Sequence, residues 1–147
     1  MKKLCLIGCG SSGKQHLNNF LALSDLVEVV GFCDYDEERA LDCVRLAKNG
    51  RAYTDYKVML ESEQPDMVYI CVPPYCHGEI ERDVIERGIP FFVEEPVAMD
   101  METAIQIRNS AEEKGLITAV GFQCRYSLIS DQTRAFCKNN EIICVDC

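Results

Sequence analysis

The chain has 147 residues, a length typical of one domain, and its 48% hydrophobic and 27% charged content is ordinary for a soluble globular protein. Its 24 acidic residues outnumber its 15 basic residues, so its formal net charge of −9 argues against nucleic-acid binding. No apolar run reaches the roughly 18 residues of a membrane span. The apolar run near Met1 stops at Gly8, too early for a signal sequence. We expect a cytoplasmic protein with no nucleic-acid or membrane partner.

Strand and helix patterns alternate along the chain. In order, they predict a strand at 3–8, a helix at 13–24, a strand at 27–34, a helix at 36–48, a strand at 51–53 and a helix at 55–62. The second half continues with a strand at 66–72, a helix at 77–87, a strand at 90–93, a helix at 100–114, a strand at 116–121, a helix at 130–138 and a strand at 141–145. Pro73 and Pro74 end the fourth strand, because proline cannot extend a β-ladder.

This alternation with short connections predicts an α/β fold with a parallel sheet covered on both faces. Right-handed crossovers then give a doubly wound, Rossmann-type arrangement. Ligands of such folds bind outside the carboxyl ends of the strands. We therefore expect the site at the turns that follow Gly8, Asp34, Val72 and Val93.

The most informative motif is the G-x-G-x-x-G sequence from Gly8 to Gly13, which follows a strand and opens a helix. Gly8 permits the tight turn, Gly10 lets the backbone approach a pyrophosphate, and Gly13 allows close packing of helix and strand. The helix start at Ser11 and Ser12 supplies free N–H groups to the phosphates. The motif predicts a dinucleotide site.

Asp34 ends the second strand, 21 positions after Gly13, where its carboxylate can bind the hydroxyls of the adenosine ribose. A carboxylate repels the 2′-phosphate of NADP, and Arg39 lies about one helical turn away from the expected phosphate pocket. NAD is therefore preferred over NADP. Asp34 could instead cap the next helix, but Asp36 fits that role better.

Ten cysteines are many for this length. Cys5, Cys33 and Cys71 lie in expected buried strands, where a free thiol acts as a small apolar group. Cys144 and Cys147 have C-x-x-C spacing but lack a second pair, so we favour reduced thiols over zinc binding or redox use. With two histidines and no carboxylates in metal-ligand spacing, the sequence predicts no metal site; His16 is expected on the surface or in packing.

The chain resembles the glucose–fructose oxidoreductase, inositol dehydrogenase and MocA family from residue 3 to about residue 138. The resemblance rests on the ordered segments GCGSSG, GFCDYDEERA, CVPPYCHGEI, VEEPVAMD and GFQCRYS. It implies that Glu94 lies near the nicotinamide ribose and that Gly121, Phe122 and Arg125 cross toward a substrate domain. The expected cofactor-binding residues are then Gly8, Gly10, Ser11, Ser12, Gly13, Asp34, Val72, Pro73, Pro74, His77, Glu94 and Arg125, with His77 lining the cleft rather than catalysing.

Two departures from the family matter. Glu95 stands where the family usually carries the lysine that orients substrate and relays a proton, so impaired catalysis is expected, with Glu95 as a general base the alternative. We expect the second, α+β substrate domain of the family to be missing here: the resemblance implies a Rossmann domain at 1–122 and, at 123–147, a linking helix and one strand of a truncated substrate domain. An edge strand at 141–145 could pair two copies into a homodimer.

The resulting prediction is the NAD-binding domain of an oxidoreductase that resembles sugar and cyclitol dehydrogenases, acting on a small polyol or sugar in a full-length form. The alternative is a non-enzymatic nucleotide-binding or interaction module. A methyltransferase that uses S-adenosylmethionine also begins with a glycine-rich loop, but the full G-x-G-x-x-G motif and the Pro73-Pro74 pair argue against it.

Overall fold

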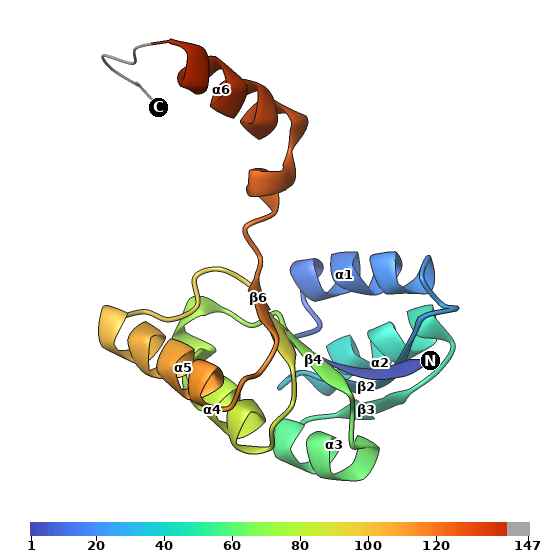
Figure 1. The fold of residues 1–147 in the computed structure, drawn as a ribbon. Coiled ribbons are helices and arrows are strands. Elements are labelled where there is room, and N and C mark those ends of the chain that lie inside the picture. The colour runs from blue at the N-terminus through green and yellow to red at the C-terminus, as the bar shows by residue number, and fades with distance from the viewer. Residues whose placement is uncertain (141–147) are drawn as a thin grey trace.

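The computed structural model describes residues 1–140, which form a sheet flanked by helices (Figure 1). The strands are β1 Lys2–Ile7, β2 Val27–Cys33, β3 Arg51–Tyr53, β4 Met67–Ile70, β5 Phe91–Val93 and β6 Thr118–Val120. The helices are α1 Ser11–Leu21, α2 Glu37–Ala47, α3 Tyr56–Glu63, α4 Glu79–Glu86, α5 Met101–Glu113 and α6 Leu128–Asn139.

The six described strands are all parallel and lie in the order β3-β2-β1-β4-β5-β6. The chain first builds the sheet outward from β1 through β2 to β3. It then crosses back to β4, on the other side of β1, and continues outward to β6. This is the Rossmann strand order, with a topological switch point between β1 and β4. The predicted doubly wound α/β fold is therefore confirmed.

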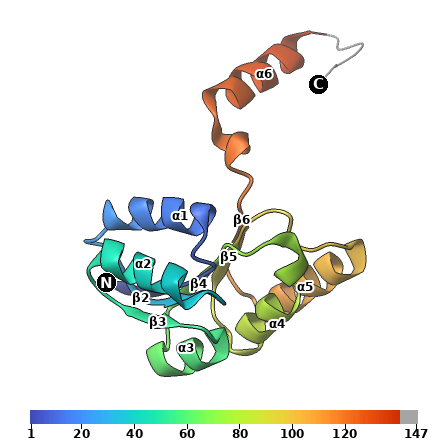
Figure 2. The ribbon, with the colours of Figure 1, turned by 180° about the vertical axis from the view of Figure 1, so that it is seen from behind.

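Helices cover both faces of the sheet (Figure 2), and a separate hydrophobic core lies on each face. On one face α3, α4 and α5 pack against the sheet through side chains such as Met59, Val84 and Ile107. On the other face α1 and α2 contribute Leu17, Phe20, Ala40 and Cys43. The central strand β1 serves both cores because its successive side chains point to opposite faces.

Aspartates begin several helices, as the sequence predicts. Asp36 accepts a hydrogen bond from the Glu38 N–H, and Asp100 accepts one from the Thr103 N–H at 2.8 Å. Such caps satisfy N–H groups that have no partner within the helix. Because Asp36 caps α2, the Asp34 carboxylate is left for another role.

Some predicted boundaries are wrong. β4 ends at Ile70 rather than at residue 72, and α4 begins at Glu79 rather than at residue 77. Between them a 3₁₀ turn, Pro74–Cys76, occupies the connection, since proline favours such a turn but cannot continue a strand. The strand expected at 141–145 and the Cys144–Cys147 pair lie outside the described residues.

The last described segment leaves the body of the molecule. After β6 the chain rises away from the sheet, and α6 stands apart from the other helices in both ribbon views (Figures 1 and 2). Leu128, Ile129 and Phe136 of this segment are exposed. Within residues 1–140, no helix has the length and apolar character needed to cross a bilayer.

Candidate functional site

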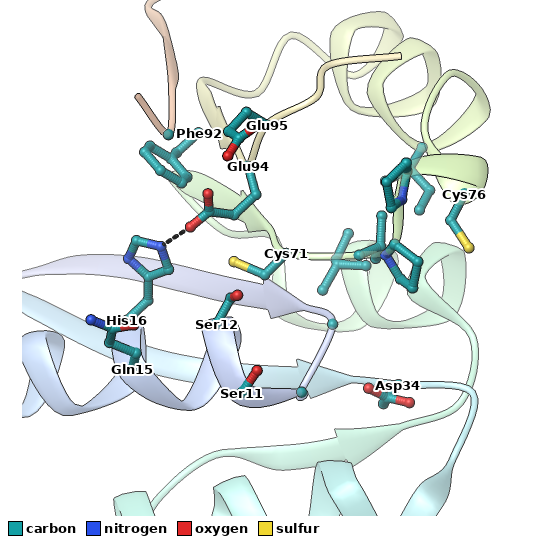
Figure 3. A pocket seen from close by; sticks show the side chains of 18 of the residues that line it. Ser11, Ser12, Gln15, His16, Asp34, Cys71, Cys76, Phe92, Glu94 and Glu95 are labelled. Carbon is teal, nitrogen blue, oxygen red and sulfur yellow. Dashed lines mark hydrogen bonds and ion pairs between the residues drawn. The ribbon is translucent and has the colours of Figure 1, made fainter. Parts of the chain in front are cut away.

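A cavity of about 1120 Å³ lies at the carboxyl edge of the sheet. It exceeds the roughly 300–1,000 Å³ typical of sites for drug-sized ligands, so it has room for an extended one. Its walls come from the ends of β1, β2, β4, β5 and β6 and from the start of α1. Figure 3 shows Asp34 at one side of this cavity and Glu94 and Glu95 at another, with Ser11 and Ser12 of α1 between them.

The turn between β1 and α1 needs its glycines for different reasons. Gly8 has φ +92°, and a Cβ there would overlap the carbonyl oxygen of Cys71. A Cβ on Gly13 would overlap the carbonyl oxygen of Gly8, so Gly13 packs α1 against the strand end. At Gly10, by contrast, a Cβ would meet nothing within 4 Å, and Gly10 lines the cavity. Gly10 therefore leaves the cavity open to a ligand.

The start of α1 is ready to bind an anion. Gly10 occupies the N-cap position, and no side chain in the described part of the chain caps this helix. The first N–H groups of an uncapped helix are free, and the helix dipole favours negative charge there. Ser11 and Ser12, which the sequence predicts to bind the cofactor, lie in this first turn and line the cavity.

Asp34 points into the cavity and is held by the backbone. Its Oδ2 accepts a hydrogen bond from the Cys9 N–H at 2.8 Å, and its Oδ1 accepts one from the Asp36 N–H at 3.1 Å. The residue is only 8% exposed. Each carboxylate oxygen can accept a second hydrogen bond, so the fixed Asp34 can still receive ligand hydroxyls.

Arg39 reaches the cavity, which the sequence reasoning did not expect. Its guanidinium lies 5.6 Å from the centre of the Tyr35 ring and its Nε lies 3.3 Å from Asp36 Oδ2. Both Tyr35 and Arg39 line the cavity beside Asp34. Helical side chains point back toward the N-terminus of their helix, so the long Arg39 side chain spans the one turn that separates it from the start of α2.

The connection after β4 contributes Val72, Pro73 and Pro74, three of the residues that the resemblance implies for cofactor binding, to the lining of the cavity. His77 does not belong to the lining. Its side chain is fully buried, with Nδ1 2.6 Å from Glu81 Oε1. The Gly78 N–H also donates to Glu81, at 2.6 Å. The expected cleft position of His77 is wrong because this buried pair turns the imidazole into the α4 start.

Two further predicted residues lie outside the cavity lining. Gly13 is buried in the contact between α1 and the first turn and acts through packing. Arg125 is exposed in the 3₁₀ turn Gln123–Tyr126, which leads toward α6. Its neighbours Gln123 and Tyr126 line the cavity instead, since a 3₁₀ turn presents only some of its side chains to one side.

Glu94 lies at the end of β5, where sequence reasoning missed its partner. His16 Nε2 lies 2.6 Å from Glu94 Oε1, and both residues line the cavity (Figure 3). His16 packs on aromatic side chains, which is one of the two positions expected for it, and it also lines the cavity, which was not expected. One signal could have found it: Gly13, His16, Leu17 and Phe20 have the spacing of one inward helix face.

Cys71 completes a cluster with this pair. Its ligand atom and those of His16 and Glu94 lie within 4.8 Å of one another, although the sequence predicted no clustered metal ligands. The three residues are 23 and 55 positions apart, so spacing along the chain could not reveal them. Burial, together with the Glu94 charge, raises the pKa of the Cys71 thiol to about 12.

Glu95 follows Glu94 and is exposed, with its side chain at the same end of the cavity (Figure 3). Among the described residues that line the cavity, Arg39 is the only lysine or arginine. Its side chain contacts Tyr35 and Asp36, the residues that follow Asp34 in the sequence, and Figure 3 shows Asp34 at the other side of the cavity from Glu95. The end that holds Glu94 and Glu95 therefore carries carboxylates and no arginine or lysine from these residues.

A family model described as "Oxidoreductase family, NAD-binding Rossmann fold", that of glucose–fructose oxidoreductase, inositol dehydrogenase and MocA, matches residues 2–122. The chain belongs to this family. D-glucoside 3-dehydrogenase of Escherichia coli is a relative of the oxidoreductase domain, 29% identical over 133 residues that cover 90% of this chain and 38% of the relative. A glycosyl hydrolase family 109 protein of Akkermansia muciniphila is 34% identical over 119 residues, 75% of this chain and 25% of that protein.

Solved structures agree with this assignment. The myo-inositol dehydrogenase of Lactobacillus casei, solved in complex with NAD(H) and myo-inositol, matches with a TM-score of 0.85 and 25% identity. The match covers 95% of this chain and 42% of that one. The chain therefore spans about two fifths of the length of such family members, and it is an NAD-binding oxidoreductase domain related to the sugar dehydrogenases.

The described residues fit NAD. The Gly10 backbone and the uncapped start of α1 suit its diphosphate, and the fixed Asp34 carboxylate suits a ribose diol. When bound, NAD supplies the acceptor or donor of a hydride. The chain's own residues hold and orient it.

Proposed function

We propose that the chain holds NAD with its adenosine ribose on Asp34, its diphosphate on the turn from Gly8 to Ser12, and its nicotinamide half toward Glu94. The proposal is supported by the position of these residues along one continuous cavity. The carboxylate of Asp34 would repel a 2′-phosphate, although Arg39 beside it offsets part of that repulsion. NAD is therefore the preferred cofactor over NADP.

The substrate of the whole protein would be a sugar or a small polyol. Relatives named for glucosides, glucose 6-phosphate and apiose support this class, as does the inositol complex of a structural neighbour. Those proteins are more than twice as long as this chain. The residues that select a substrate would lie largely in the part of those proteins that extends beyond the segment matched by this chain.

The proposal of impaired catalysis rests on the carboxylate of Glu95 at the position where the family usually carries a lysine. Hydride leaves a carbinol carbon as the oxygen loses its proton, and a nearby cation stabilises the negative charge that develops on that oxygen. The described lining supplies no lysine or arginine near Glu95, and the two carboxylates there oppose such charge. The chain as it stands would bind NAD and turn over little or nothing.

A redox assay tests this proposal. The chain would be mixed with NAD and a panel of polyols and sugars, and NADH formation would be followed by absorbance for the native chain, Glu95→Lys and Glu95→Gln. We expect no NADH from the native chain or from Glu95→Gln, and any gain only in Glu95→Lys. Sustained NADH formation by the native chain would refute the impairment and favour Glu95 as a general base.

A non-enzymatic, nucleotide-responsive interaction module is the second candidate. It is favoured by the exposed apolar side chains Leu128, Ile129 and Phe136 on the segment that projects from the body. Light scattering with and without NADH distinguishes the two. A change in association state on NADH addition, with Glu95→Lys still inactive, would favour the interaction module.

A further inference from the structure

The contact between His16 and Glu94 joins two elements that are 78 residues apart in the sequence. His16 projects from the second turn of α1, and Glu94 directly follows β5. The Nε2–Oε1 distance is 2.6 Å, which is short for a hydrogen bond between nitrogen and oxygen and typical of one to a charged acceptor. An ionised carboxylate can only accept a hydrogen bond, so with Glu94 in that form the imidazole is the donor, through Nε2–H.

The second oxygen of Glu94 is also confined. A Cβ built on Gly121 would overlap Glu94 Oε2, so the carboxylate lies directly against the backbone that follows β6. The same Cβ would come within 3.2 Å of the Phe92 ring. Glu94 therefore sits between an imidazole from α1 on one oxygen and a bare backbone on the other.

The imidazole itself is held by aromatic rings. Its centroid lies 5.0 Å from that of Phe92 and 5.4 Å from that of Tyr69, both at steep interplanar angles. The His16 and Glu94 side chains are only 22% and 20% exposed. A hydrogen bond in such a partly dry setting is stronger and better oriented than the same bond in water.

We propose that His16 is a positioning residue that fixes the Glu94 carboxylate for the ribose hydroxyls of the nicotinamide half of NAD. The inference rests on the proposed function, because it takes Glu94 as the group that receives that ribose. His16 acts through Glu94: its Nε2–H holds Oε1 while Oε2 stays against Gly121, so binding does not have to order the glutamate side chain. Both residues line the cavity, and each carboxylate oxygen can accept a further hydrogen bond.

Two variants separate the hydrogen bond from the ring packing. His16→Phe keeps an aromatic ring beside Phe92 and Tyr69 but has no donor. His16→Gln loses the ring but can place an amide N–H near the position of Nε2. Titration with NADH measures the affinity for the whole dinucleotide. Titration with ADP measures the affinity for only the half that Asp34 and the first turn would hold.

If His16 orients Glu94, His16→Phe weakens NADH binding by about tenfold while ADP affinity stays within about twofold, and His16→Gln stays close to the native affinity for both. If the ring matters and the donor does not, the two variants exchange behaviour, and the inference is overturned. Equal losses of NADH and ADP affinity in both variants would show that His16 supports only α1, which also overturns it.

A double-mutant cycle with Glu94→Gln completes the test. In the Glu94→Gln background, His16→Phe should cause no further loss of NADH affinity, since the group through which it acts has already changed. Full additivity would contradict the inference. The native titrations keep the two proposals apart: no NADH binding by the native chain refutes the proposed function, whereas native binding with an unaffected His16→Phe refutes only this inference.

Discussion

Replacing Gly10 with alanine should separate ligand binding from folding. A Cβ on Gly10 meets nothing within 4 Å, and its φ of −72° and ψ of −161° are open to alanine. The variant should therefore fold as well as the native chain, or gain about 0.4–1 kcal/mol because alanine restricts the unfolded chain. The new methyl group would enter the cavity where the diphosphate must approach the backbone. Loss of one charge-assisted N–H bond, worth about 1.5–3 kcal/mol, would weaken NADH binding at least tenfold.

Gly13→Ala is the matched control for this experiment. Its Cβ would overlap the Gly8 carbonyl oxygen, a backbone atom, so α1 would have to shift, at a cost of roughly 1–3 kcal/mol in the free energy of unfolding. Urea denaturation and calorimetric titration with NADH would be measured on both variants. Native stability with lost binding is expected for Gly10→Ala, and lost stability for Gly13→Ala. Unchanged NADH affinity in Gly10→Ala would refute the view that this backbone contacts the diphosphate.

The other predictions concern the nicotinamide end, cofactor choice and the thiols. Gly121→Ala should displace the Glu94 carboxylate and weaken NADH binding severalfold with little change in ADP binding, both read by titration. Asp34→Asn should narrow the preference for NADH over NADPH, because it removes the charge that opposes a 2′-phosphate. Alkaline pH should destabilise the fold: burial raises the pKa of three thiols to about 12, so an unfolded chain with thiol pKa values of about 8.5 releases protons that the folded chain keeps. The free energy of unfolding should then fall as the pH rises from about 8.5 toward 12, measured by urea denaturation; the thiols are those of Cys5, Cys33 and Cys71.

Each of these predictions has a clear contrary result. Equal losses of ADP and NADH affinity in Gly121→Ala would mean that the substitution disturbs the whole sheet edge. An unchanged cofactor preference in Asp34→Asn would mean that the carboxylate does not face the 2′ position. A constant free energy of unfolding across the alkaline range would mean that the three thiols ionise as easily in the folded chain as in the unfolded one.

The fold was largely predictable because its signals are local. Alternating apolar runs, the aspartate caps at Asp36 and Asp100 and the Pro73-Pro74 pair each act within a few residues, and they agree with one another. Boundaries at the site were less predictable. The exact end of β4 and start of α4 depend on the 3₁₀ turn at Pro74–Cys76 and on the buried His77–Glu81 pair, which no single run of sequence specifies.

The candidate site was predictable where its chemistry lies within a motif. The glycine turn and Asp34 come to the cavity as expected. At the nicotinamide end the sequence predicted Glu94 but not its neighbours, because His16, Cys71 and Glu94 meet through tertiary packing of α1 on the sheet. Arg39 was expected about one helical turn away from the site, yet it lines the cavity, because the reach of a long side chain depends on the direction in which its helix leaves the strand.

Calorimetric titration of the native chain with NADH and with NADPH tests the central claim most directly. If an open backbone turn receives the diphosphate and Asp34 receives the adenosine ribose, NADH should bind at one site per chain, and NADPH more weakly. If neither nucleotide gives a binding heat at millimolar concentration, or if NADPH binds more tightly than NADH, that account is contradicted.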